Sequence, residues 1–151
     1  MSPPIHASAF SYHGAGCLVL GESGSGKSTL LAEVMLRGAK LVADDRVALH
    51  ASDAQLIANP VEPLRGVLEL RGFGLIRQEE VVEAQPIHLV IALDAAANER
   101  LPEPATHHYY GIAVPFLSVP PPPVLSAAAL LLYLEAVQEG RSLPTDWHPL
   151  G

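Results

Sequence analysis

The stretch GESGSGKST, residues 21–29, contains the residue types that bind the phosphates of a nucleotide. It matches G-x-x-x-x-G-K-[ST] between an apolar strand pattern and a helical one, which is the context that this motif requires. Backbone N–H groups and the helix N-terminus supply the phosphate contacts. Lys27 is expected to reach the β- and γ-phosphates, and the Ser28 hydroxyl is expected to ligate Mg²⁺. The candidate phosphate-binding residues are Gly21, Glu22, Ser23, Gly24, Ser25, Gly26, Lys27, Ser28 and Thr29.

Two adjacent carboxylates, Asp44 and Asp45, follow the apolar run of LVADDRV (41–47). The end of a strand in an open α/β sheet is the usual place for functional carboxylates. Neighbouring strand residues point in opposite directions, so only one of the two is expected to face the γ-phosphate, unless the strand has already broken.

A second candidate pair stands in LELRGFG (68–74), where Glu69 and Arg71 lie two residues apart on one face of an extended segment. Glycines follow them and allow close approach of the backbone. Phosphoryl transfer needs metal ligands and cations for the transferring oxygens, and this pair offers one of each.

The phosphate loop alone leaves the class of reaction open. The chain has neither the Asn-Lys-x-Asp nor the Asp-x-x-Gly that a GTPase needs. A small-molecule kinase with an Arg-rich lid is less favoured, because the basic residues are scattered.

These side chains are expected to be positioned by one α/β domain that spans residues 1–151. Strand patterns occur at 7–13, 16–20, 40–45, 87–94 and 109–119. An extended segment broken by glycines is expected at 66–77, and a hairpin at 46–60 that turns at Ser52-Asp53. Helices are predicted at about 27–37, ending at Gly38, and at 124–139, closed by Gly140. Residues Leu130 to Tyr133 are apolar on all sides of the second helix, which predicts burial between layers or subunits.

Composition excludes several classes of protein. The net charge of −7 argues against a nucleic-acid groove, and only Lys27 and Lys40 are lysines. The single Cys17 predicts a buried, reduced residue. No secretory signal is recognisable, and the longest apolar run, 14 residues at 124–137, is too short to span a membrane. The sequence therefore predicts a cytoplasmic protein with no membrane partner.

Together, GESGSGKSTLL, RGAKLVADDRV and LELRGFGLI resemble the catalytic domain of HPr kinase/phosphorylase. The resemblance runs in order from about residue 6 to about residue 139, without the family's separate N-terminal domain. It implies an α/β P-loop kinase domain of the phosphoenolpyruvate-carboxykinase-like type, with a central mixed sheet and flanking helices. It also implies ATP and Mg²⁺ as cofactors, an HPr-like phosphocarrier protein as partner, and a homohexamer.

The resemblance assigns roles to individual residues. Asp45 matches the group that accepts the proton of the seryl hydroxyl, and Asp44 becomes a supporting residue. Glu69 matches a magnesium ligand beside Ser28. Arg71 lies in the family signature. By resemblance, the active site also includes His6, fifteen residues before Gly21, and Arg100, in NERLPEP.

One departure concerns the reverse reaction, phosphorolysis. The family carries a Pro-Gly-Arg-Asn stretch before its last helix, whereas this chain has SVPPPPVLSAA at 118–128. Kinase activity is therefore better supported than phosphorylase activity. Two alternatives stay open: a related kinase with a small molecule or another protein as acceptor, and a non-catalytic nucleotide-binding regulator.

Overall fold

The computed structural model describes residues 3–150. Its elements, in chain order, are β1 (Ser8–Tyr12), β2 (Ala15–Leu20), α1 (Lys27–Leu36), β3 (Lys40–Ala43), β4 (Ala48–Ser52), β5 (Gln55–Asn59), β6 (Val67–Leu70), β7 (Gly74–Arg77), β8 (Gln85–Leu93), β9 (Ala105–Tyr109), β10 (Ile112–Val119) and α2 (Ala127–Gln138). Within these residues no helix combines the length and apolarity needed to cross a bilayer.

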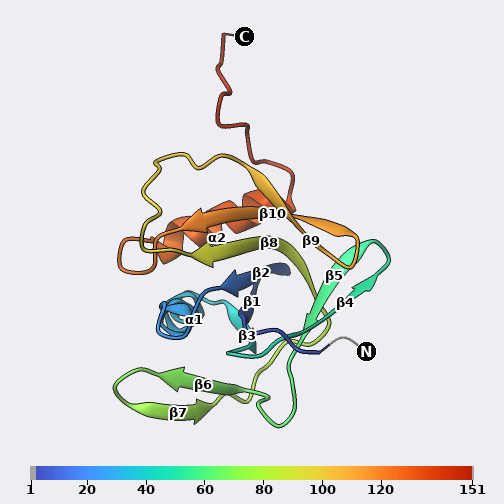
Figure 1. Cartoon of the computed structure of the whole chain (residues 1–151), viewed down its shortest axis with the longest axis vertical. Coiled ribbons are helices and arrows are strands. Elements are labelled where there is room, and N and C mark those ends of the chain that lie inside the picture. The colour runs from blue at the N-terminus through green and yellow to red at the C-terminus, as the bar shows by residue number, and fades with distance from the viewer. Residues whose placement is uncertain (1–2, 151) are drawn as a thin grey trace.

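The central sheet is mixed, as predicted (Figure 1). Its strand order is β3-β1-β2-β8-β10-β9, and β4 and β5 join it through β8. Strands β2, β8 and β10 run parallel, while β1 is antiparallel to both β2 and β3. The fold is therefore α/β with parallel strands at the centre and antiparallel strands toward the edges.

Alternating residues of the sheet face two different cores. On one face, Cys17 and Leu89 pack with Leu30 and Leu134 from the helices. On the other face, Leu18 packs with residues that include those of the β4–β5 hairpin. Both helices in the described chain thus contribute to the same core. The predicted burial of Cys17 is confirmed, and burial raises the pKa of its thiol.

Helix α2 buries one face. Leu130, Leu131 and Leu134 are buried, while Leu132 is 69% exposed and Tyr133 is 40% exposed. Burial between the layers of one chain therefore covers only one face of the helix, and burial between subunits stays a prediction. The helix has more apolar side chains than the face that packs on the sheet can bury.

This arrangement predicts contrasting effects of two similar substitutions in α2. Leu134→Ala should lower the free energy of unfolding by about 2–5 kcal/mol, because Leu134 is 0% exposed and its removal leaves a cavity. Leu132→Ala should change it by less than about 0.5 kcal/mol. Urea denaturation of both variants measures the difference. Equal losses would mean that Leu132 is also covered in solution.

Several predicted boundaries need correction. The segment 66–77 is a hairpin, β6–β7, and 109–119 is part of a second hairpin, β9–β10, which turns at Tyr110 (φ 53°) and Gly111 (φ 82°). The hairpin at 46–60 turns one residue later, at Asp53-Ala54. The second helix begins at 127, because the Ser126 hydroxyl caps it by accepting from the Ala129 N–H.

The strand directions bring several loops together at one edge of the sheet, the edge formed by the carboxyl ends of its parallel strands. Strands β2, β3 and β8 end there, so the phosphate loop, the Asp pair and the loop after Leu93 all start from this edge. Because β1 runs antiparallel to β2 and β3, the segment that precedes it reaches the same edge. This is the edge at which open α/β sheets bind ligands.

Candidate active site

The phosphate loop joins β2 to α1 and leaves the first turn of the helix free for an anion. Gly26 is the N-cap residue with φ 107°, a conformation that strongly favours glycine, and no side chain caps this end. The first turn also contains no acidic residue. Its N–H groups and the positive end of the helix dipole therefore suit phosphate.

The side chain of Lys27 extends from the start of α1 back to the first residues of the phosphate loop. Its side chain is 6% exposed, and its ammonium donates to the carbonyl oxygens of Gly21 (2.5 Å) and Glu22 (3.0 Å). Burial lowers its pKa, while the negative charges of Asp45 and Asp44 act in the opposite direction. A buried cation with only carbonyl partners gains strongly from an anionic phosphate.

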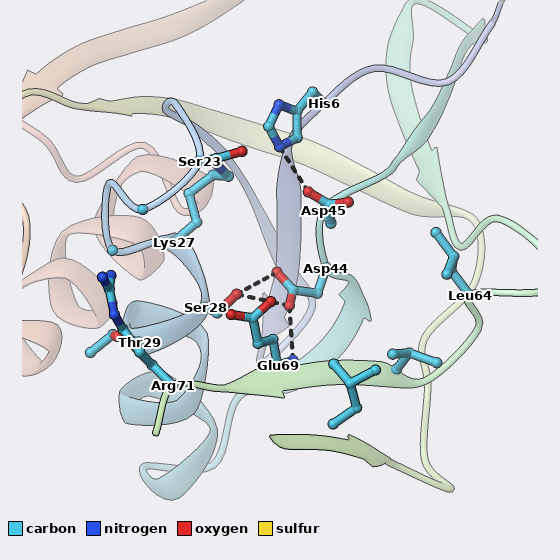
Figure 2. Close-up of a pocket in the computed structure, with 14 residues that line it drawn as sticks. His6, Ser23, Lys27, Ser28, Thr29, Asp44, Asp45, Leu64, Glu69 and Arg71 are labelled. Carbon is cyan, nitrogen blue, oxygen red and sulfur yellow. Dashed lines mark hydrogen bonds and ion pairs between the residues drawn. The ribbon is translucent and has the colours of Figure 1, made fainter. Parts of the chain in front are cut away.

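Asp44 is buried, and both oxygens of its carboxylate accept hydrogen bonds. Its carboxylate accepts from the Ser28 hydroxyl (2.9 Å to Oδ2 and 3.1 Å to Oδ1), the Ser8 hydroxyl (2.8 Å) and the Glu69 N–H (3.3 Å). Figure 2 shows Ser28, Asp44 and Glu69 close together. One carboxylate thus connects the phosphate loop, the first strand and the β6–β7 hairpin.

Asp45 lies in a different environment. Its side chain is 60% exposed, and His6 Nε2 lies 2.8 Å from its Oδ1 (Figure 2). Arg46 lies 3.6 Å from its other oxygen. Backbone hydrogen bonds in both directions between Ile5 and Val47 hold the His6 segment beside this turn.

Both carboxylates line the same cavity, so strict strand alternation does not apply to them. The reason is that β3 ends at Ala43 and the chain turns at Asp45, which has φ 70°. Aspartate is one of the few residues other than glycine that adopt this left-handed conformation readily. The turn gives the two neighbours different surroundings on one cavity wall.

The cavity has a volume of about 320 Å³. It is lined by His6, Ser23, Gly24, Gly26, Lys27, Ser28, Thr29, Asp44, Asp45, Leu64, Val67, Glu69, Arg71 and Leu75. Most residues predicted from the sequence are therefore brought together. Glu69 and Arg71 come from the β6–β7 hairpin, which lies beside α1 (Figure 1).

A few predicted residues lie outside this lining. Gly21 and Glu22 contribute the carbonyls that hold Lys27. The Ser25 hydroxyl is buried and has no hydrogen-bond partner among residues 3–150. Gly21 also has a steric reason: a Cβ there would stand 2.4 Å from Ser25 Oγ. Arg100 is exposed in the loop between β8 and β9 and does not line the cavity.

Sequence reasoning missed four residues at or beside the site. Leu64, Val67 and Leu75 line the cavity as apolar walls, and the buried Ser8 bonds to Asp44. The apolar residues carry no chemical signature. For Ser8, the one available signal was a small polar residue at the start of a predicted strand, two positions after His6.

The donors near the loop suit magnesium. The Ser28 hydroxyl and the carboxylates of Asp44 and Glu69 are hard oxygen donors. No group of three or more His, Cys, Asp or Glu within residues 3–150 could hold a metal alone. Mg²⁺ in phosphoryl-transfer sites needs only one or two carboxylates besides the phosphates, so these residues fit it.

The parallel strands, the phosphate loop and the carboxylate bonded to Ser28 define a P-loop kinase fold. The chain matches the HPr Serine kinase C-terminal domain family over residues 2–139, and it belongs to that family.

Individual relatives agree with this membership. HPr kinase/phosphorylase of Streptococcus pyogenes serotype M5 (strain Manfredo) is 44% identical over 73 residues, as is that of Streptococcus agalactiae serotype III (strain NEM316). Each match covers 48% of this chain and 24% of the relative's length. The Hpr(Ser) kinase/phosphatase from Coxiella burnetii has a similar structure, with a TM-score of 0.75, 28% identity, and coverage of 92% of this chain and 90% of that one.

Proposed function

We propose that this chain is an ATP-dependent protein serine kinase that phosphorylates HPr, the phosphocarrier protein of the phosphotransferase system. The contact of 2.8 Å between His6 and the exposed carboxylate of Asp45, on the wall of the phosphate-loop cavity, carries this proposal. Asp45 is then the base, His6 is the group that orients it, and the phosphate loop lies in the same cavity.

In the proposed reaction, Asp45 takes the proton of a seryl hydroxyl as the seryl oxygen bonds to the γ-phosphorus of ATP. The bond between that phosphorus and the bridging oxygen breaks, and ADP leaves. Lys27 and Arg71 stabilise the transferring oxygens. Arg100 would join them only if its loop moved toward the cavity. Positioning and charge supply most of the catalysis in such reactions.

Magnesium is part of this proposal. When bound, Mg²⁺ would neutralise negative charge on the phosphate oxygens of ATP. Ser28 and Glu69 would hold the ion, and Asp44 supports Ser28 by accepting a hydrogen bond from its hydroxyl. The cavity is lined by three carboxylates and by two cationic side chains, those of Lys27 and Arg71. A divalent cation would therefore also offset the repulsion between the carboxylates and the phosphates of ATP.

The forward reaction is better supported than phosphorolysis. Residues 118–128, SVPPPPVLSAA, contain neither the arginine nor the asparagine of the stretch that the resemblance associates with dephosphorylation. The experiment that tests the proposal incubates the chain with labelled ATP and purified HPr, with and without inorganic phosphate. Label on an HPr seryl residue supports the kinase. Unlabelled HPr would contradict it, and would favour a small-molecule kinase or a non-catalytic nucleotide-binding regulator.

A cytoplasmic location and a homohexameric assembly complete the proposal. Exposed apolar side chains support self-association: Phe73 is 94% exposed, Leu36 89% and Leu75 70%. Light scattering of the purified chain tests the assembly, and a monomer at micromolar concentration would contradict it.

His6 should contribute less than the base that it contacts. His6→Asn is expected to lower the turnover number for HPr by about 10-fold, which corresponds to about 1.4 kcal/mol, because Asp45 keeps its carboxylate but loses a fixed partner. ATP affinity should change little. His13→Asn is the matched control, since His13 pairs with Glu135 and does not line the cavity. Equal losses in both variants would contradict the role of His6.

A further inference from the structure

The hydroxyl of Ser8 contacts both members of the Asp pair. It donates to Asp44 Oδ1 (2.8 Å) and accepts from the Asp45 N–H (3.3 Å). Ser8 is the first residue of β1, and it is 0% exposed. The Ser8 hydroxyl both donates and accepts a hydrogen bond, and no water competes for it because it is buried. Its orientation is therefore fixed.

This bridge lies where the chain leaves regular structure. Strand β3 ends at Ala43, and Asp45 adopts φ 70°, so its N–H lies outside the regular ladder of the strand. Ser8 supplies the acceptor for that N–H and thereby ties the turn to β1. Loss of the hydroxyl would leave the Asp45 N–H without this side-chain acceptor.

The same hydroxyl orients Asp44. Ser8 engages Oδ1, while the Glu69 N–H donates to Oδ2 and the Ser28 hydroxyl reaches both oxygens. The rotation of a carboxylate is fixed when separate donors hold its two oxygens. Ser28 is the proposed magnesium ligand, so the orientation of Asp44 also determines how the Ser28 oxygen faces the metal.

We propose that Ser8 is a positioning residue for phosphoryl transfer, which sets the metal-side carboxylate of Asp44 and the base of Asp45 relative to each other with one hydroxyl. The proposal rests on the proposed kinase function. It assigns Ser8 no contact with substrate; Ser8 acts through its two neighbours. It also gives a reason for the burial of a hydroxyl at the first position of β1.

Ser8→Ala tests this with two readouts. The turnover number for HPr should fall by about 10- to 100-fold, the usual cost of removing a residue that orients metal-site ligands. Independently of any acceptor, the gain in ATP affinity on going from EDTA to Mg²⁺ should shrink by about 10-fold. Ser11→Ala is the matched control, because Ser11 is a buried serine of the same strand and contacts neither aspartate.

Two further variants keep the test decisive if Ser8→Ala folds poorly. Ser8→Thr retains the hydroxyl and should recover most of both readouts, whereas Ser8→Cys has a similar size with a weak donor and should not. Unchanged turnover and unchanged magnesium gain in Ser8→Ala or Ser8→Cys would overturn the proposal. If wild-type chain leaves HPr unlabelled, the kinase proposal fails, and the magnesium gain alone decides the role of Ser8.

Discussion

Replacing Asp45 by Asn should lower phosphoryl transfer to HPr by about 10³-fold and leave ATP affinity within about 3-fold of wild type. The amide has nearly the shape of the carboxylate but cannot take the seryl proton. Asp45 is 60% exposed, and its side chain holds no part of the phosphate loop. Asparagine also tolerates the φ of 70° at this turn, so folding should be preserved. Single-turnover kinetics with labelled ATP, together with calorimetric ATP titration, measure the two quantities.

The chain offers a matched control for this substitution. Asp53 is an exposed aspartate with a positive φ of 49°, at the β4–β5 turn and outside the cavity. Asp53→Asn makes the same chemical change in a similar backbone conformation and should leave both quantities unchanged. Wild-type transfer rates in Asp45→Asn would show that another group accepts the proton.

The fold could be predicted to the level of sheet class and most strands. Alternating or continuous apolar runs marked the strands around 7–20 and 87–94, and these are the central strands of the sheet. The turns were harder. Tyr110-Gly111 breaks what looks like one strand from 109 to 119, because a two-residue turn with positive φ needs only one glycine and a tolerant neighbour.

The packing around α2 also could not be read from the sequence. Periodicity shows that Leu130, Leu131, Leu132 and Tyr133 are apolar, but not which of them the sheet covers. That depends on the strand order, which places β2 and β8 beneath one side of the helix and leaves Leu132 exposed. Strand order is fixed by long-range pairing, and local pattern carries little information about it.

The site divides in the same way between local and long-range information. The phosphate loop is a contiguous motif, so its residues could be named from the sequence. His6 and Asp45 are 39 positions apart in the chain and meet only because β1 runs antiparallel to β3. Resemblance supplied that pair; residue types alone did not. Ser8 has no motif, and its role is visible only from two hydrogen bonds to a distant turn.

The two aspartates thus have different physical requirements. Asp44 is 7% exposed and needs several donors to offset the cost of burying its charge. Asp45 is exposed and needs freedom to exchange a proton with an acceptor in the cavity. The residues are adjacent, yet the end of β3 and the left-handed turn give each its own surroundings. Substitutions that remove one charge at a time should therefore produce different defects.

Asp44→Asn is expected to lower transfer by about 10²-fold through magnesium. The gain in ATP affinity from EDTA to Mg²⁺ should be largely lost, because the Ser28 hydroxyl no longer has a charged acceptor behind it. The amide must also place an NH₂ group against the donors of Ser8, Ser28 or Glu69, which should lower the free energy of unfolding by about 1–3 kcal/mol. Calorimetric ATP titration with and without Mg²⁺, and urea denaturation, measure these effects.

The comparison with Asp45→Asn makes this prediction specific. Asp45→Asn should keep the magnesium gain and the stability while losing the chemical step, whereas Asp44→Asn should lose the first two and recover part of its rate at high Mg²⁺. Asp94→Asn is the control for a carboxylate at the same edge of the sheet, since Asp94 follows β8, accepts from the Ala96 N–H and lies outside the cavity. Identical defects in Asp44→Asn and Asp45→Asn would contradict the division of roles, because two equivalent carboxylates sharing one metal would fail together.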